Sequence, residues 1–472
     1  MPKKKKRKKY QTPTGMHDIL PEDQYIWQYF YRMAEDTVDF YNFERIDTPI
    51  LESTKLFEKG TGAGTDIVSK EMYSLKTKGG DTLTMRPEGT PPVVRAYIQH
   101  GMKKWTSPVK LYYAGQFFRH EKPQRGRFRQ LHQFGLEIIG EDDPSRDVEI
   151  IHTIYVLLDR LRLKELTVEI NSIGCSSCRP KYVKELKAHY RYKLKQICAD
   201  CRRRYKENPL RMLDCEEDKC YRVKSEAPHI VDFLCNECNE HFKQVLDIMD
   251  FIDVPYLLNP YMVRGLDYYT RTVFEFYYGG VEEAASQNDA PPEKEEKEEE
   301  GKDDKKDKKD KEDKEKKDEA EENKKRLAIA SGGRYDGLVK ALGGKDTPGV
   351  GAAIGIDRVV ELLKREDKEP RESKKPRVFI VQLGEMAKKK AFKMFEEFRK
   401  ANIPIREALG RDSISSQLKL ANKFDADFAI IIGQKEALDN VAIIREMDTG
   451  TQETIPEEKL IKEIKKRLKK KK

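Results

Sequence analysis

The alternation of apolar and polar positions divides the chain into four regions. The first, residues 10–170, mixes helix and strand patterns, with an amphipathic helix over residues 25–43 and two strands around a polar turn in residues 110–140. Residues 175–252 have helical periodicity, and residues 255–364 return to strands and glycine-rich turns. At 472 residues, two or three domains are expected, each able to bury a core.

The fourth region follows a charged linker at residues 365–376. Short, fully apolar strands at residues 378–381 and 428–433 alternate with helices predicted over residues 385–402 and 415–424. Strands without polar alternation are typical of sheets buried on both faces. This pattern predicts a small α/β domain with a largely parallel sheet.

A run of charge interrupts the third region. Of the 34 residues from 293 to 326, 31 are charged, so almost nothing apolar is present to offset the chain entropy of folding. The flanking segments, residues 274–276 and 327–330, both have strand character. We therefore expect a disordered loop, residues 284–326, extending from a hairpin.

Most of the net charge of +9 comes from the two ends of the chain. Residues 3–9 and 465–472 hold seven Lys or Arg each, which leaves the remainder slightly acidic, so the net charge does not indicate a nucleic-acid-binding body. We predict basic tails at residues 1–9 and 465–472. The first is either a solvated or RNA-attracting tail or a nuclear localisation signal.

The sequence contains no apolar stretch of membrane-helix length and no secretory signal region at its start. All eight cysteines lie between Cys175 and Cys238. A disulfide-stapled secreted protein would distribute them differently. These features predict a cytoplasmic protein in a reducing compartment, with no membrane partner.

The cysteines form four close pairs with C-x₂-C or C-x₄-C spacing, which suits tetrahedral zinc thiolates. Reduced, buried thiols are the alternative. For a structural zinc ion, the preferred ligand set is Cys198, Cys201, Cys235 and Cys238.

Residues 118–140 combine a polar turn with an alternating strand. Because strand side chains alternate between faces, one face carries Arg127, Arg129, Gln133 and Glu137. The opposite face carries Phe128, Phe134, Leu136 and Ile138. A phosphate-clamping surface and an exposed sheet face with scattered charges both fit this pattern.

Three further segments carry arginines and carboxylates near glycines. They are residues 84–90 (TMRPEGT), 263–276 (VRGLDYYTRTVFEF) and 331–337 (SGGRYDG) leading to 349–358 (GVGAAIGIDR). The glycines match neither the dinucleotide-binding fingerprint nor a P-loop.

Together these segments resemble class II aminoacyl-tRNA synthetases, and specifically the histidyl-tRNA synthetase family. Residues 45–52 resemble motif 1 with its interface proline, residues 118–140 motif 2, and residues 349–358 motif 3. Residues 263–276 and 331–337 resemble the two histidine-specific signatures. The chain departs from the family pattern at Asp357, where glutamate is usual, and in the charged run.

The resemblance implies an α+β catalytic domain built on an antiparallel sheet. Its two parts, residues 10–174 and 253–364, flank a helical cysteine-rich insertion at residues 175–252, and an α/β anticodon-binding domain follows at residues 377–464. It also implies a homodimer that activates L-histidine with ATP and Mg²⁺ and then transfers it to the 3′ end of tRNA(His).

The resemblance assigns roles to single residues. Arg119 and Arg264 are expected to be catalytic, and ATP is expected at Arg119, Arg127 and Arg358. Histidine is expected at Glu88, Thr90, Arg119, Gln133, Glu137, Arg264, Tyr268 and Tyr269. Because neighbours on a strand face opposite ways, one of the two tyrosines is expected to be largely structural. The alternatives are a histidine-sensing regulatory paralogue and an RNA-binding scaffold.

Overall fold

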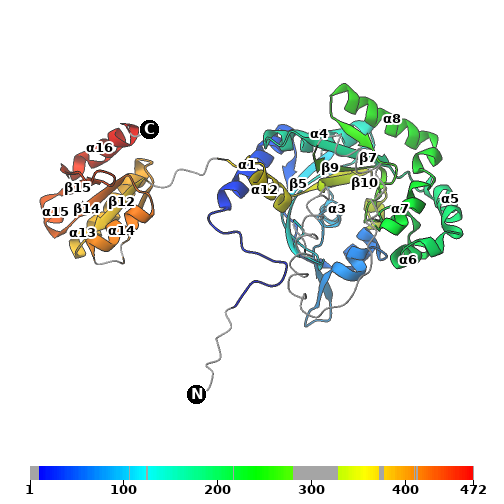
Figure 1. Ribbon diagram of the computed structural model, residues 1–472, viewed down its shortest axis with the longest axis horizontal. Helices are drawn as coiled ribbons and strands as arrows, with labels where there is room; N and C mark the ends of the chain where they lie inside the picture. Colours follow the sequence, from blue (N-terminus) through cyan, green and yellow to red (C-terminus); the bar gives the residue numbers. More distant parts are fainter. Residues whose placement is uncertain are drawn as a thin grey trace, which may run out of the picture. The chain divides into compact units, whose positions relative to one another are not determined.

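The computed structural model describes residues 10–105, 107–123, 126–215, 217–279, 328–370, 377–408, 410 and 413–470. The chain divides into two compact units, Met1–Pro370 and Arg371–Lys472 (Figure 1). None of the described helices is long and apolar enough to cross a membrane. The expected basic tail at residues 1–9 and the charged loop at residues 284–326 lie outside the described residues.

An eight-stranded sheet forms the centre of the first unit. Its strands are, in spatial order, β1 (Glu44–Arg45), β5 (Val109–Phe118), β6 (Gln130–Ile139), β11 (Gly349–Gly355), β10 (Ala328–Arg334), β9 (Thr270–Tyr278), β7 (Leu166–Ser172) and β8 (Tyr256–Leu258). All pairs from β5 to β7 are antiparallel, and only the edge strands β1 and β8 pair in parallel. The α+β class with an antiparallel sheet is therefore confirmed.

Two apolar cores cover the two faces of this sheet. On one face pack α1 (Gln24–Phe40), α4 (Pro144–Arg160), α12 (Ile356–Arg365) and α8 (Asn236–Phe251). On the other pack α3 (Thr90–Gln99), the short α11 (Leu338–Ala341) and the 3₁₀ turn Met102–Lys104 (Figure 1). Odd-numbered positions of β6 face the second core and even-numbered ones the first, because side chains alternate along a strand.

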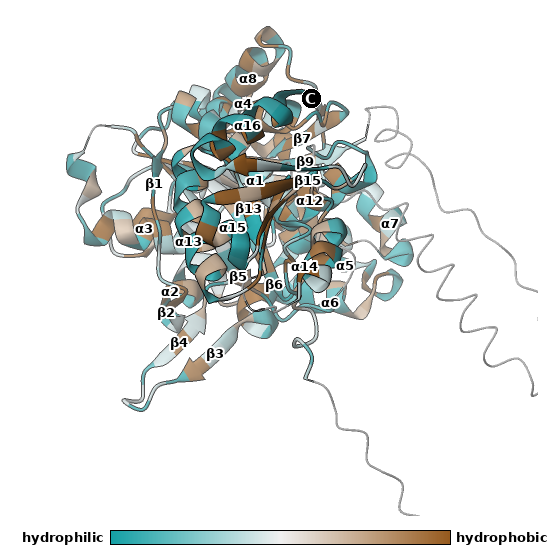
Figure 2. Cartoon of the chain, turned by 90° about the vertical axis from the view of Figure 1, so that its left-hand side faces the viewer, coloured by the Kyte–Doolittle hydropathy of each residue, from teal (hydrophilic) through white to brown (hydrophobic). Residues whose placement is uncertain are grey.

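A small three-stranded sheet lies beside the second face. Its strands are β2 (Leu51–Ser53), β4 (Thr82–Met85) and β3 (Tyr73–Lys76). The β3–β4 hairpin projects from the body of the unit (Figure 2). Between β2 and β3 run α2 (Thr54–Phe57) and two π-helical turns, Glu58–Gly62 and Ile67–Glu71.

The chain between β7 and β8 forms the predicted helical insertion. It contains α5 (Arg179–Arg191), α6 (Ala199–Glu207), α7 (Asp218–Ser225) and α8, with 3₁₀ turns at Leu194–Gln196, Pro209–Met212 and Ile230–Phe233. Side chains of α5 to α7 belong to the same core as α3, whereas side chains of α8 belong to the core of α1 and α4 on the opposite face of the sheet. The insertion thus wraps around one edge of the sheet.

The two strands that border the charged run pair as predicted. Strands β9 and β10 are antiparallel neighbours, with Phe276 opposite Ala330 and Phe274 opposite Gly332. The eight-stranded sheet is therefore continuous across a long sequence separation.

The second unit has a five-stranded sheet, in the order β13 (Ile405–Glu407), β12 (Val378–Gln382), β14 (Phe428–Ile432), β15 (Val441–Glu446) and β16 (Gln452–Pro456). Its helices are α13 (Glu385–Lys400), α14 (Ile414–Lys423), α15 (Gln434–Asp439) and α16 (Glu457–Lys470). The predicted parallel arrangement is confirmed for β12, β13 and β14, but β15 and β16 are antiparallel, so the sheet as a whole is mixed. Only the six-residue α15 separates β14 from β15, which is shorter than a parallel crossover needs, and Asn440 turns the chain back at φ 55°.

The predicted C-terminal tail is also wrong as far as Lys470, because these residues belong to α16. Leu460 and Ile464 are buried, and Leu468 packs on the same core. This spacing of four places an apolar stripe on one face of a helix. Arg467 Nε donates to Glu463 Oε1 at 2.9 Å, so part of the basic charge is paired.

Candidate active site

Polar side chains gather over the strand face that carries Gln133 and Glu137 on β6, and together they form the candidate site. Glycines border both positions in the neighbouring strands: Gly351 is opposite Glu137, and Gly115 and Gly355 flank Gln133. A Cβ on Gly351 would lie 1.8 Å from Glu137 Oε2. Gly351 therefore leaves room for Glu137 above the sheet, whereas Gly115 and Gly355 leave room for Arg86 and Arg358.

Glu137 is fully buried between two hydroxyl groups. Thr90 Oγ1 donates to Oε1 at 2.6 Å and Tyr335 Oη donates to Oε2 at 2.6 Å. Burial raises the pKa of Glu137 to about 8, although both hydroxyl groups oppose this shift. The site thus contains an acid that is easily protonated and holds further acceptor capacity.

Glu88 is a second buried carboxyl group of the candidate site, close enough to interact with Glu137. It accepts hydrogen bonds from the hydroxyl of Thr61 and, at 2.6 Å, from Tyr268. Burial raises its pKa, and Arg119 and Arg264 are among the groups that oppose this shift. Since Glu88 also raises the pKa of Glu137, the two carboxyl groups interact through space.

Tyr268 and Tyr269 both lie near the carboxyl groups of the candidate site, so the expectation that they point to opposite faces is wrong. Strand β9 begins only at Thr270, and the two tyrosines lie in the preceding turn with ring centroids 4.7 Å apart. Burial raises the pKa of Tyr269 to about 12, while Arg264 lowers it. The Tyr269 ring lies against Gly333, where a Cβ would come within 2.9 Å of it.

Arg264 connects the tyrosines to the sheet. Its guanidinium pairs with Glu275 on β9 and donates to Ser331 Oγ on β10 at 2.8 Å. Its Nε is buried and has no hydrogen-bond partner among the described residues, and the same holds for Gln133 Oε1. Buried polar atoms without partners are costly, and the described residues leave both of these atoms unsatisfied.

Three arginines, Arg119, Arg127 and Arg264, lie near Arg358. Arg358 is held by the carbonyls of Gly126, 3.1 Å from its Nε, and of Ala328. Burial lowers its pKa to about 10, and the positive charges of Arg127, Arg119 and Arg264 lower it further. Arg119 donates to the carbonyl of Pro87 at 2.9 Å and lies 3.8 Å from Glu121. Four guanidinium groups therefore lie near one another, with Glu121 beside Arg119 and Glu275 paired with Arg264.

The predicted alternation of β6 does not extend to Arg127 and Arg129. The strand begins at Gln130, and Arg129 instead packs against Gly15 and donates from Nε to the carbonyl of Glu121 at 3.0 Å. Arg127 is exposed, at the rim of the arginine cluster.

Asp357 is buried and bonds back to β6. It accepts from the backbone N–H of His132 at 2.6 Å and lies 3.2 Å from His132 Nδ1. The aspartate therefore anchors the first turn of α12, from which Arg358 projects.

Sequence reasoning missed several partners of the predicted residues. Thr61, Tyr335 and Glu275 hold Glu88, Glu137 and Arg264, respectively. Tyr335 and Glu275 lie inside segments already recognised, and Thr61 lies in the glycine-rich stretch of residues 60–65, which was a signal that was not used. The partner of each is distant in sequence and could not be read from local pattern.

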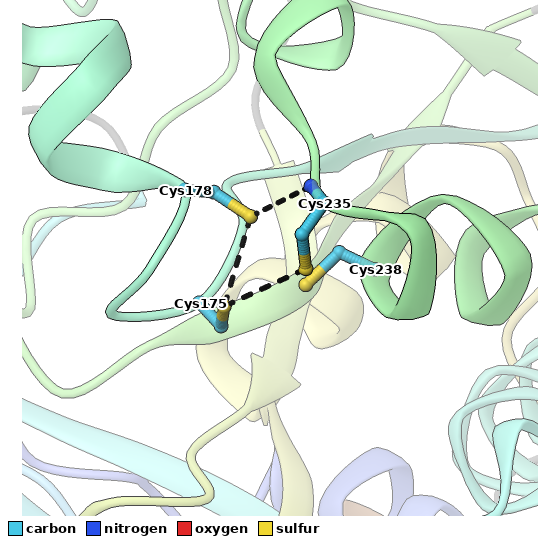
Figure 3. Close-up of side chains that lie close together, drawn as sticks. All are labelled: Cys175, Cys178, Cys235 and Cys238. Carbon is cyan, nitrogen blue, oxygen red and sulfur yellow. Dashed lines mark hydrogen bonds between the residues drawn. The ribbon is translucent and has the colours of Figure 1, made fainter.

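The eight cysteines gather into two groups of four Sγ atoms, and the atoms of each group lie within 4.8 Å of one another. One group is Cys175, Cys178, Cys235 and Cys238 (Figure 3), and the other is Cys198, Cys201, Cys215 and Cys220. The predicted set of Cys198, Cys201, Cys235 and Cys238 is therefore wrong. The path of the insertion brings the start of α8 back to the end of β7, whereas α6 meets the start of α7.

Comparison with known proteins agrees with this geometry. Residues 15–287 match the family model for histidyl-tRNA synthetase, and residues 377–467 match that for an anticodon binding domain. A histidine–tRNA ligase of Dehalococcoides mccartyi is 41% identical over 97% of this chain and 100% of its own length. One from Caldicellulosiruptor saccharolyticus is 40% identical over 98% and 100%.

A solved structure gives the same result. The apo histidyl-tRNA synthetase of S. aureus superposes with a TM-score of 0.72 at 32% identity, covering 96% of this chain and 99% of its own. Half of the chain or more matches one family model, and relatives of about 40% identity match it end to end. The chain therefore belongs to the histidyl-tRNA synthetase family.

Proposed function

We propose that this chain ligates L-histidine to tRNA(His) in two steps, with ATP as the source of energy. One observation carries the proposal: two buried carboxyl groups with their hydroxyl partners lie near Arg119 and Arg264, and these two arginines in turn lie near Arg127 and Arg358. A small molecule with an imidazole and an ammonium group complements the first part, and a triphosphate complements the second.

The carboxylate end is the proposed histidine site. Glu88 and Thr90 hold the α-ammonium group, and Gln133 contacts the substrate with its partnerless Oε1. Glu137 and Tyr269 pair with the two ring nitrogens, and Tyr268 lines the pocket. A neutral imidazole offers one donor and one acceptor, so pairing both nitrogens discriminates against apolar side chains of similar size.

The arginine end is the proposed ATP site. Arg119 and Arg264 contact the α-phosphate, Arg127 the outer phosphates, and Arg358 the adenine and γ-phosphate. Histidine attacks the α-phosphorus through a carboxylate oxygen, the bond to the β-phosphate oxygen breaks, and diphosphate leaves. The arginines position the reacting groups, and Mg²⁺ bound with ATP would add charge neutralisation at the phosphates.

In the second step, a ribose hydroxyl at the 3′ end of tRNA attacks the carbonyl carbon of the adenylate, and AMP leaves. The second unit binds the anticodon region, and Lys419 and Lys423 lie exposed about one turn apart on α14, where they suit a phosphate backbone.

We infer that the enzyme works as a cytoplasmic homodimer. Ile50 and Leu51, in the segment that resembles motif 1, are 43% and 41% exposed, as a dimer contact through this segment requires. We assign the catalytic domain to residues 10–174 and 253–364, the insertion to residues 175–252, and the anticodon-binding domain to the region from residue 377.

Histidine-dependent exchange of diphosphate into ATP tests the proposal. Exchange with histidine alone among the twenty amino acids, lost in Arg264→Ala, supports adenylate formation at this pocket. Charging of tRNA(His) transcript tests the second step. Histidine binding without exchange would favour the regulatory paralogue instead, although the matched anticodon-binding domain and the retained arginines Arg119, Arg264 and Arg358 argue against it.

A further inference from the structure

We propose that the insertion holds two structural zinc ions, each bound by four cysteine thiolates. The junction site consists of Cys175, Cys178, Cys235 and Cys238, and the inner site of Cys198, Cys201, Cys215 and Cys220. The two sites use all eight cysteines of the chain.

The sulfur positions of the junction site fit a tetrahedral ion. Cys175 Sγ lies 3.6 Å from Cys178 Sγ and 3.9 Å from Cys235 Sγ. With zinc–sulfur bonds of about 2.3 Å, the edges of a tetrahedron are about 3.8 Å long. In Figure 3 the sulfur atoms of Cys175, Cys235 and Cys238 gather toward one another, with Cys178 completing the group from the start of α5.

The inner site has the same dimensions. Cys198 Sγ lies 3.8 Å from Cys215 Sγ, and Cys220 Sγ lies 3.9 Å from Cys201 Sγ. A disulfide requires about 2.05 Å between sulfurs, so these are not disulfides. Four thiolates leave no coordination position for water or substrate, which makes each site structural.

Backbone N–H groups point at the sulfur atoms in both sites. The N–H of Cys235 donates to Cys178 Sγ at 3.1 Å, and that of Ser177 to Cys175 Sγ at 3.4 Å. In the inner site, Cys198 N–H donates to Cys220 Sγ at 3.2 Å and Cys201 N–H to Cys198 Sγ at 3.3 Å. Such donors stabilise thiolate charge and fix the orientation of metal ligands.

The position of each site explains what the metal would do. The junction site joins the chain just beyond β7 to the first turn of α8, 60 residues later, and so closes the insertion at its base. The inner site joins α6 to α7 across a short segment. Metal binding that closes such loops contributes directly to folding free energy.

Residues beside the ligands contact the histidine signature. Arg179, next to Cys178, donates to the backbone carbonyl of Tyr269 and, at 3.3 Å, to that of Ile173. Asn208, between the ligands of the inner site, donates to Asp267 Oδ1 at 2.8 Å. This part of the inference rests on the proposed function: the junction site holds Arg179 against the backbone of Tyr269 and so positions this tyrosine for histidine. The inner site holds the turn that contains Asp267.

Metal content of the purified full-length chain tests the sites directly. Zinc analysis by mass spectrometry is expected to give two ions per chain, one in Cys178→Ser/Cys238→Ser, one in Cys201→Ser/Cys220→Ser, and two in the matched control Ser177→Ala. Loss of both ions in either pair of substitutions would overturn the assignment of two separate sites. Zinc-free protein from zinc-supplemented culture, with eight thiols reactive in the native state, would overturn the inference as a whole.

Cobalt substitution keeps the test independent of the variants' stability. Wild-type protein refolded with Co²⁺ should show sulfur-to-metal charge transfer and the intense ligand-field bands of tetrahedral tetrathiolate coordination, with two equivalents bound. A weak octahedral spectrum would contradict four-thiolate sites.

Histidine kinetics test the positioning role. Removing the junction site should raise the KM for histidine roughly tenfold or more while changing the KM for ATP little, because Tyr269 loses its brace. Equal effects on both constants would overturn that role. If the wild type holds two zinc ions but shows no diphosphate exchange, the metal sites are supported and the proposed function fails, so the two ideas are separable.

Discussion

The two ends of the candidate site differ in charge and in hydrogen bonding. At the carboxylate end, Glu88 and Glu137 each accept from two hydroxyl groups and are buried with raised pKa values. At the arginine end, Arg358 lies among like charges, and Arg264 keeps a partnerless Nε. The two carboxyl groups of the first end are thus hydrogen-bonded within the protein, whereas the four guanidinium groups at the second end pair with two carboxylates among the described residues, Glu121 and Glu275.

This difference indicates how each end recognises its substrate. The carboxylate end is pre-formed, so a substrate adds hydrogen bonds to groups already fixed in place. Under the proposed function, the arginine end gains further balancing negative charge when ATP phosphates bind, beyond that of Glu121 and Glu275. Substitutions at the two ends should therefore act on different kinetic constants.

The largest effect is expected from Arg264→Ala. Removing a positioned donor that acts on developing negative charge costs about 10²–10³-fold in kcat, and Glu275 also loses its partner. Diphosphate exchange measures this loss, with Arg191→Ala, an exposed arginine on α5, as the matched control. An Arg264→Ala protein with normal kcat and only a higher KM would contradict the assigned role.

The next effect concerns stability and pH. Burial raises the pKa of Glu137 from 4.5 to about 8, so the unfolded chain releases this proton before the folded one does. The contribution of Glu137 to stability is complete below pH 4.5 and is lost as the pH rises to about 8. Urea denaturation of ligand-free protein should show wild type losing stability relative to Glu137→Gln across this interval. Parallel curves would contradict the raised pKa.

A smaller effect is expected on histidine binding in Glu137→Gln. Above pH 8, where the Glu137 carboxyl group is ionised, the variant lacks a charge-assisted hydrogen bond to the imidazole, which corresponds to an increase in KM for histidine of about 10- to 100-fold. The KM for ATP should stay within about twofold, because no charge at the arginine end changes. Exposed Glu207 on α6 provides the control Glu207→Gln. A matching rise in the KM for ATP would remove the distinction between the two ends.

The smallest effect is expected from Gly351→Ala. Its Cβ would displace the Glu137 carboxyl group, so the KM for histidine should rise about tenfold by steric pressure alone. The control Gly337→Ala places its Cβ where no atom lies within 4 Å. Equal behaviour of the two variants would show that Glu137 tolerates movement.

Local patterns were sufficient for much of the fold. The helix predicted over residues 25–43 is α1, and the two strands predicted around a polar turn are β5 and β6. The arrangement of β9 and β10 around the charged run was also predicted. These elements follow from apolar periodicity, which depends only on neighbouring residues.

The contacts between residues distant in sequence could not be predicted from local patterns. Tyr335 reaches Glu137 across 198 residues of sequence, and the grouping of the cysteines depends on where α8 returns to the sheet. Spacing alone leaves several pairings of four cysteine pairs open. The α16 helix likewise needed the core of the second unit to bury Leu460 and Ile464.

By itself, then, the sequence determined the regular helices and strands, because these depend on short-range periodicity, while the class of fold and the roles of the motif residues came from the resemblance of its motifs to a known family. The tertiary structure alone decided which side chains meet: Tyr268 packs on Tyr269, three arginines lie near Arg358, and the cysteines form two separate groups of four. The physical reason is that contacts between distant residues are set by strand order and chain path, which local periodicity does not specify.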